Sequence, residues 1–249
     1  FAFTGISLGG GMSLHAGGVD SRVKAVVALS GFNSLSEGMY NNETTAEFSA
    51  KRLLFAGAVF GRPTKEADAA YEKALGPLED VSDLLKFLGT RDPDIHLEEF
   101  NRRKLPIFIS HNFGDVYFVP QNMIRFFDKL TGPKQLLLNA GAHAGPEVAE
   151  IQSRDSLIWK SAIKWLDNYL KGAANGVESD PIVRMQVGET EQHVPFFTWP
   201  DSPIVRTKTF HLTPRGERWF GGLMSKGAPS ADWLAERARK AGGPDTLKY

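Results

Sequence analysis

Residues 1–11 read FAFTGISLGGG, and within them the pattern Gly5-x-Ser7-x-Gly9 is the strongest local indication of the fold. The short apolar run before Gly5 has the character of a strand, and the small residues after Ser7 have the character of a helix. A serine at such a sharp strand-to-helix turn occupies a nucleophile elbow, which exposes its hydroxyl at the top of a sheet. We expect the flanking glycines to remove side chains that would clash in the turn. The alternative is an ordinary glycine-rich turn.

A βαβ unit surrounds this pattern. Residues 12–18 are helical in character, residues 19–22 form a turn, and Lys24–Leu29 is a continuous β-branched and aliphatic run. A fully apolar run of that length is typical of a strand buried on both faces, as in a parallel sheet. Further along the chain we expect strands over 105–110 and 134–138 and helices over 120–130 and 153–171. The sequence therefore predicts an α/β fold with a parallel sheet.

Two later residues complete a candidate catalytic group. A serine nucleophile needs a general base, which an acid must orient, and at such an elbow their chain order is serine, acid, histidine. Asp115 follows the expected strand 105–110, and His143 follows the strand 134–138. Both lie at carboxyl ends of parallel strands, where such sheets bind ligands. We predict that Ser7, Asp115 and His143 form the catalytic triad. The alternative for Asp115 is a turn residue. We also predict that the backbone N–H of Leu8 is an oxyanion donor.

The other histidines fit structural roles better. His111 stands at a strand end but precedes the acid, so the chain order favours a hydrogen-bonded or pocket-lining role for it. His15 falls within the first helix, where packing or surface exposure is the default. No histidine has partners at the spacing of a metal site, and the chain has no cysteine. We therefore expect no metal and no cofactor.

The composition excludes several classes of protein. Lys and Arg together number 29, as do Asp and Glu, so the formal net charge is zero. A nucleic-acid binder or a protein held on anionic lipid by a basic surface would show net or clustered positive charge. No apolar run approaches the roughly 18 residues of a membrane span. With 42% hydrophobic and 23% charged residues, the chain is typical of a soluble globular protein, and its compartment stays open.

Residues 34–100 and 177–249 differ from the parallel-sheet segments. Glycines and prolines interrupt apolar residues at helical spacing over 34–100, which predicts several short helices and little sheet. This segment contains five candidates to line an apolar acyl pocket: Met39, Tyr40, Phe48, Phe55 and Phe60. The alternative for each of them is packing in the core. Short strands are expected over 181–187, 195–199 and 206–212, and one helix around 232–241. The basic run Arg102-Arg103-Lys104 is expected to be a solvated loop.

The chain resembles the α/β-hydrolase family of X-prolyl dipeptidyl peptidases and cocaine-esterase-type enzymes. The resemblance covers the chain from 1 to about 215. The segments that carry it are Gly5–Gly10, Phe113-Gly114-Asp115, Trp165–Gly172, Asp180–Gly188 and Phe197–Pro200. The resemblance implies a nucleophile at Ser7, an orienting acid at Asp115 and a general base at His143. It also implies a hydrolase core (1–33 and 101–176), an inserted helical cap (34–100) and the start of a C-terminal jelly-roll-like β-domain (177–249).

Two features depart from that family pattern. The nucleophile stands at position 7, whereas several strands precede it in this fold, so we expect a sheet incomplete at its N-terminal side and a second oxyanion donor upstream of this chain. The β-domain is also short. We therefore expect the chain to be a piece of a larger protein, with a complementary segment of that protein bound to it, because unpaired strand edges would otherwise be exposed.

These expectations lead to a serine hydrolase that cleaves carboxylic esters through an acyl-enzyme. An X-prolyl dipeptidyl peptidase or another amide or acyl-amino-acid hydrolase is the alternative, for which Glu37, Glu43 or Glu47 could hold a substrate amino group. A non-catalytic binding or scaffold module with a hydrolase fold is the alternative of another class. The expected partners are a small ester or peptide substrate and, as an open possibility, a second copy of the chain, with no nucleic acid and no membrane.

Overall fold

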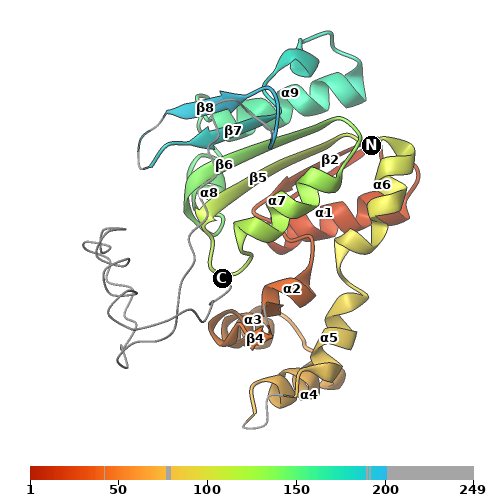
Figure 1. Ribbon diagram of the computed structural model, residues 1–249, viewed down its shortest axis with the longest axis vertical. Helices are drawn as coiled ribbons and strands as arrows, with labels where there is room; N and C mark the ends of the chain where they lie inside the picture. The colour runs from red at the N-terminus through yellow and green to blue at the C-terminus, as the bar shows by residue number, and fades with distance from the viewer. Residues whose placement is uncertain (42, 77–79, 189, 191, 201–249) are drawn as a thin grey trace, which may run out of the picture. The chain divides into compact units, whose positions relative to one another are not determined.

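The computed structural model describes residues 1–41, 43–76, 80–188, 190 and 192–200. Within them a mixed sheet has the strands β1 (Ala2–Ile6), β2 (Ala25–Leu29), β5 (Ile107–Gly114), β6 (Lys134–Ala142), β7 (Val183–Gln186) and β8 (His193–Phe196). They lie in the order β1-β2-β5-β6-β7-β8, visible in Figure 1. Neighbours from β1 to β7 pair in parallel, and only β8 is antiparallel to its neighbour β7. The parallel sheet expected from the apolar runs is confirmed.

Helices cover both faces of this sheet (Figure 1). The helices α1 (Leu8–Val19), α6 (Leu97–Arg103) and α7 (Pro120–Lys129) pack against one face, and α9 (Leu157–Lys171) packs against the other. The alternation within β2 explains the two layers, because Val26 and Ala28 join the first cluster while Val27 and Leu29 join the second. A strand with apolar side chains on both faces must be buried twice, as its continuous apolar sequence indicated.

The helix α9 begins later than expected. The apolar periodicity predicted a helix from residue 153, but α9 starts at Leu157, where the Ser156 hydroxyl accepts a hydrogen bond from the Trp159 N–H at 3.2 Å. Such a cap satisfies one of the free N–H groups at a helix start. A short helix that the sequence did not predict, α8 (Gly145–Ala149), precedes it.

The segment between β2 and β5 is mostly helical. It contains α2 (Leu35–Met39), β3 (Tyr40–Asn41), β4 (Thr44–Thr45), α3 (Glu47–Phe60), α4 (Lys65–Ala74), α5 (Ser82–Gly89) and the 3₁₀ turn η1 (Pro93–His96). Its helices share a hydrophobic cluster of their own, with Met39, Ala50, Ala70, Ala74, Leu84 and Leu88 at its centre. Short helices with very little sheet are as expected for this segment. Its role as a cap stays a prediction.

The basic run at 102–104 is not a solvated loop, which corrects our expectation. Arg102 and Arg103 form the last turn of α6, and only Lys104 lies beyond it, with a φ of 52°. The Arg103 side chain is 12% exposed and donates hydrogen bonds to the carbonyl oxygens of four residues, Gly17, Asp20, Ser21 and Val23. Helix ends leave carbonyl groups unpaired, so a guanidinium fits the end of α1 well.

The last two described strands extend the main sheet. β7 pairs with β6 in parallel, and β8 pairs with β7. The sequence assigned residues 177–249 to the start of a C-terminal β-domain, and that assignment stays a prediction; the two strands described here pair with the main sheet. The third expected strand (206–212) and the expected helix (232–241) lie outside the described residues. In the described part of the chain, no helix combines the length and the apolarity that a bilayer crossing requires.

Candidate active site

Ser7 lies between β1 and α1 in a conformation that few non-glycine residues adopt. Its φ is 59° and its ψ is −121°. Its backbone N–H donates a hydrogen bond to the Leu29 carbonyl oxygen at 2.9 Å, which ties the turn to β2. Its hydroxyl does not cap α1 and is therefore available for another partner. Such backbone strain costs on the order of 1–3 kcal/mol and is typically found at functional sites.

Of the two glycines that flank Ser7, Gly5 has the expected role and Gly9 does not. A Cβ at Gly5 would lie 2.4 Å from the Gly9 carbonyl carbon, so Gly5 is required. A Cβ at Gly9 would meet nothing within 4 Å, so this glycine does not relieve a clash within this structure. Gly10 is the constrained partner instead, because its Cβ would lie 2.8 Å from the Leu29 oxygen and 2.9 Å from the Gly31 Cα. The close approach of α1 to the end of β2 explains this requirement.

Strand pairing brings Asp115 and His143 together. β5 runs on to Gly114 and β6 to Ala142, beyond the expected ends at 110 and 138, and these two residues pair with each other after a shift in register. Asp115 and His143 directly follow this last pair. A Cβ at Gly114 would lie 2.6 Å from the Gly141 carbonyl oxygen, so the close approach at this point needs a glycine.

The three predicted triad residues form a hydrogen-bonded chain. Ser7 Oγ lies 2.7 Å from His143 Nε2, and His143 Nδ1 lies 2.7 Å from Asp115 Oδ2. An ionised carboxylate only accepts hydrogen bonds, so Nδ1 carries the imidazole proton and Nε2 is free to accept the proton of the Ser7 hydroxyl. This is the arrangement in which a histidine can act as a general base toward a serine.

Asp115 is held from two sides. Its side chain is fully buried, and its Oδ1 accepts the backbone N–H groups of Tyr117 and Phe118 at 2.9 and 3.0 Å. The other oxygen is left for His143. The rings of Tyr117 and Phe118 lie against the His143 imidazole, with centroids 4.9 and 5.3 Å away. The sequence analysis did not predict these two aromatic residues, although an aromatic pair two residues after a candidate acid is a signal that could have found them.

His111 has a structural role. It is fully buried, and its Nε2–H donates a hydrogen bond to the Phe118 carbonyl oxygen at 2.7 Å. Burial lowers the pKa of His111, which keeps its imidazole neutral. Its Nε2 is 3.9 Å from Asp115 Oδ2, too far for a hydrogen bond, so His143 and not His111 is the partner of the acid.

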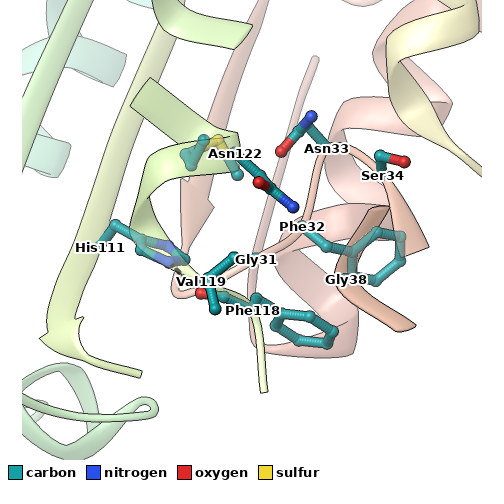
Figure 2. A pocket seen from close by; sticks show the side chains of 10 residues that line it. Gly31, Phe32, Asn33, Ser34, Gly38, His111, Phe118, Val119 and Asn122 are labelled. Atoms are coloured by element: carbon teal, nitrogen blue, oxygen red, sulfur yellow. Dashed lines mark hydrogen bonds between the residues drawn. The ribbon is translucent and has the colours of Figure 1, made fainter. Parts of the chain in front are cut away.

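A small pocket lies beside His111. Figure 2 shows the side chains around it, which come from the segment after β2, from β5, from the loop before α7 and from the start of α7, among them Phe32, Asn33, Phe118 and Asn122. It has essentially no room for a water-sized sphere. This pocket is therefore not a substrate site.

The predicted pocket residues separate into buried and exposed groups. Met39 is fully buried in the cluster of α2–α5, so it contacts core residues and not a surface that a ligand reaches. Tyr40 is partly buried, and Phe55 is 67% exposed. Phe48 is 54% exposed, and its ring centroid lies 6.4 Å from that of Tyr117, beside His143. Phe48 is thus the predicted pocket residue that these contacts connect to the candidate triad.

The start of α1 supplies a candidate donor to an oxyanion. Leu8 is the first residue of α1, and the first N–H groups of a helix have no partner within it. The Leu8 N–H can therefore donate to a negative oxygen beside Ser7.

The helix α3 is tied to the loop that carries Asp115, because the Ser49 hydroxyl donates a hydrogen bond to the Val116 carbonyl oxygen at 2.6 Å. In the described ranges, no group of three or more possible ligand side chains could hold a metal ion.

Comparison with known proteins places these residues in a family. A family model described as X-Pro dipeptidyl-peptidase (S15 family) matches residues 1–145. Candidate Xaa-Pro dipeptidyl-peptidases of Bacillus cereus and Bacillus anthracis are 23% and 22% identical over 178 residues, which are 70% of this chain. The match spans only 28% and 27% of those relatives, little more than a quarter of their length.

Solved structures show the same fold. A CocE/NonD family hydrolase from Staphylococcus aureus superposes with a TM-score of 0.60 at 15% sequence identity, over 84% of this chain and 36% of that one. A second structure of a CocE/NonD family hydrolase from the same organism gives a TM-score of 0.55 at 15% identity, over 79% of this chain and 34% of that one. At this identity the likeness concerns the fold, which is α/β-hydrolase-like. With its family match over more than half of its length, the chain belongs to the X-Pro dipeptidyl-peptidase family S15, a family of serine hydrolases.

Proposed function

We propose that this protein is a serine hydrolase that cleaves carboxylic esters through an acyl-enzyme on Ser7. The observation that carries the proposal is the continuous hydrogen-bonded chain from Ser7 Oγ through His143 to Asp115, with 2.7 Å at each link. A serine hydroxyl at its ordinary pKa is a weak nucleophile and becomes useful only beside such a base. The strained backbone at Ser7 supports the proposal, because it presents the hydroxyl at the start of α1.

In the proposed reaction His143 Nε2 takes the proton of Ser7 as Oγ attacks the carbonyl carbon. The buried Asp115 carboxylate stabilises the imidazolium that forms and keeps the ring in one tautomer. The Leu8 N–H and the N-terminal end of α1 stabilise the oxyanion. His143 then returns the proton to the leaving group, and a water molecule activated by the same histidine hydrolyses the acyl-enzyme. The expected second oxyanion donor stays without an assigned residue.

The substrate class depends on whether a carboxylate is available to hold a substrate amino group. An X-prolyl dipeptidyl peptidase must hold the free amino group of its substrate, and we considered Glu37, Glu43 and Glu47 for that task. Glu37 already pairs with Arg125 at 3.1 Å, and Glu47 pairs with Lys51. Two of the three candidate carboxylates are thus engaged elsewhere, and we keep the ester as the first substrate class. The family match and the names of the relatives favour the peptidase, which is therefore the second candidate.

The experiment compares three probes on the purified protein and on Ser7→Ala. A fluorophosphonate should add one phosphonyl group to Ser7, as measured by intact mass spectrometry. p-Nitrophenyl butyrate and Gly-Pro-p-nitroanilide then separate esterase from dipeptidyl-peptidase activity. We expect Ser7→Ala to fold normally and to lose turnover by about 10⁴-fold or more.

The outcomes separate the three candidate functions. Turnover of the ester alone supports the esterase, and a higher kcat/KM on the prolyl anilide establishes the peptidase. Turnover retained by Ser7→Ala would end the proposed chemistry. A folded protein that takes no phosphonyl group and turns over neither substrate would be a binding or scaffold module with this fold.

A further inference from the structure

The side chain of Glu147 is buried close to the candidate triad. It lies in the short helix α8, four residues after His143, and it is fully buried. Its Oε1 accepts a hydrogen bond from Ser110 Oγ at 2.7 Å, and its Oε2 accepts one from Asn112 Nδ2 at 2.8 Å. No lysine or arginine forms an ion pair with it among the residues that the structure describes. Burying a carboxylate without a cation is costly, so its hydrogen bonds must hold it there.

The bonds of Glu147 continue to the loops of the triad. Asn112 uses its second amide N–H to bind Ser30 Oγ at 2.7 Å, and the same oxygen accepts the backbone N–H of Ala144 at 3.2 Å. Ala144 directly follows His143. The backbone carbonyl oxygen of Asn112 also accepts the backbone N–H of Asp115 at 3.2 Å. The network therefore reaches Ala144, next to His143, and the end of β5, just before Asp115.

The network also reaches the strand next to the nucleophile. Ser30 directly follows Leu29, whose carbonyl oxygen accepts the Ser7 N–H at 2.9 Å. Ser30 and Ala144 have φ values of 44° and 56°, in the left-handed region that non-glycine residues rarely adopt. Strained residues persist only where surrounding bonds over-determine them. The hydrogen bond between these two residues, supported through Asn112 by Glu147, provides such a constraint.

We propose that Glu147 is a positioning residue for His143. It fixes the turn His143–Ala144 against Ser30, through Asn112 and through its own place in α8, and so keeps Nε2 of His143 within reach of Ser7. Glu147 acts through these hydrogen bonds and not on the reacting atoms. This inference rests on the proposed function for its kinetic consequence, but the geometry that it concerns can be measured without turnover.

The variants Glu147→Ala and Glu147→Gln separate positioning from folding. Alanine removes both acceptors and leaves the Ser110 hydroxyl and the Asn112 amide without their partner. Glutamine can accept from Asn112 through Oε1 and donate to Ser110 Oγ through Nε2, so it preserves the connections. Glu150→Ala is the matched control, because Glu150 lies in the same segment and its carboxylate accepts the Ser156 hydroxyl instead.

Two readouts are needed. The first is the rate of fluorophosphonate labelling at Ser7, per folded molecule as judged by circular dichroism. The second is the downfield NMR signal of the His143 Nδ1 proton in its bond to Asp115, recorded with ¹⁵N-labelled histidine. We expect Glu147→Ala to label about 10- to 100-fold more slowly and to lose the signal, since a displacement of about 1 Å has that effect on rate. Glu147→Gln and Glu150→Ala should keep both.

Each outcome decides a point. A folded Glu147→Ala that keeps its labelling rate and its signal overturns the positioning role and leaves the hydrolase proposal standing. A protein that never labels, but whose signal is present and is lost in Glu147→Ala, refutes the hydrolase and supports the positioning role. Where Glu147→Ala does not fold, Ser110→Ala tests the proposal instead, because it removes one hydrogen bond to Glu147. An unchanged labelling rate and an unchanged NMR signal in Ser110→Ala would overturn the proposal.

Discussion

Gly114→Ala tests whether the pairing of β5 and β6 places the acid beside the base. The added Cβ would lie 2.6 Å from the Gly141 carbonyl oxygen, whereas ordinary contacts begin at 3.4 Å. The strands must therefore separate or twist by about 0.8 Å at the pair that directly precedes Asp115 and His143. Backbone atoms form the obstacle, so a side-chain rotation cannot relieve it.

The magnitude follows from that displacement. A misplacement of about 1 Å in a catalytic group costs about 100-fold in rate, so we expect labelling of Ser7 by a fluorophosphonate to slow by about 10- to 100-fold. Overpacking of this kind also lowers the free energy of unfolding by about 1–3 kcal/mol. The assay measures the second-order labelling rate constant and the urea unfolding curve of each variant.

The matched control is Gly145→Ala. Gly145 begins α8, two residues after His143, and a Cβ there would meet nothing within 4 Å. We expect this variant to label at the rate of the unchanged protein. A folded Gly114→Ala that labels within about threefold of Gly145→Ala would refute the reasoning, because the strand register would then not determine the geometry of the triad.

Two further changes test stability. Arg103→Ala should lower the free energy of unfolding by about 2–3 kcal/mol, since it removes charge-assisted hydrogen bonds to the carbonyl oxygens of four residues. Arg102→Ala removes an exposed partner of Glu99 and should leave the urea unfolding curve unchanged, and equal effects of the two substitutions would contradict this. Burial, together with the Asp92 carboxylate, raises the pKa of Asp94 from 3.8 to about 6. The folded state thus favours the protonated acid, and the stability from this group is full below pH 3.8 and is lost as the pH rises through 6. Asp94→Asn should therefore be more stable than the unchanged protein by about 1 kcal/mol at pH 7, after solvent screening, and the gain should vanish near pH 4; a gain of the same size at both pH values would contradict the assignment.

Local patterns in the sequence were sufficient to predict the main elements of the fold. Continuous apolar runs predicted the strands β2, β5 and β6, and amphipathic spacing predicted α7 and α9, because a single element shows its own burial through its periodicity. The order of Ser7, Asp115 and His143 along the chain predicted a shared sheet edge. The structure places their side chains within hydrogen-bonding distance of one another.

Features that depend on two distant segments were beyond the reach of the sequence. Residues 111–114 and 139–142 have polar and glycine-rich sequences with weak strand character, and they extend the sheet only because β5 and β6 pair there. Arg103 and Glu147 have the residue types of a solvated surface, yet each is held by partners far along the chain. Polar side chains of this kind are buried where a neighbour supplies their hydrogen bonds. Local sequence thus determined which elements form and in what order the reactive side chains occur, whereas tertiary pairing alone decided how closely those side chains approach and what holds them.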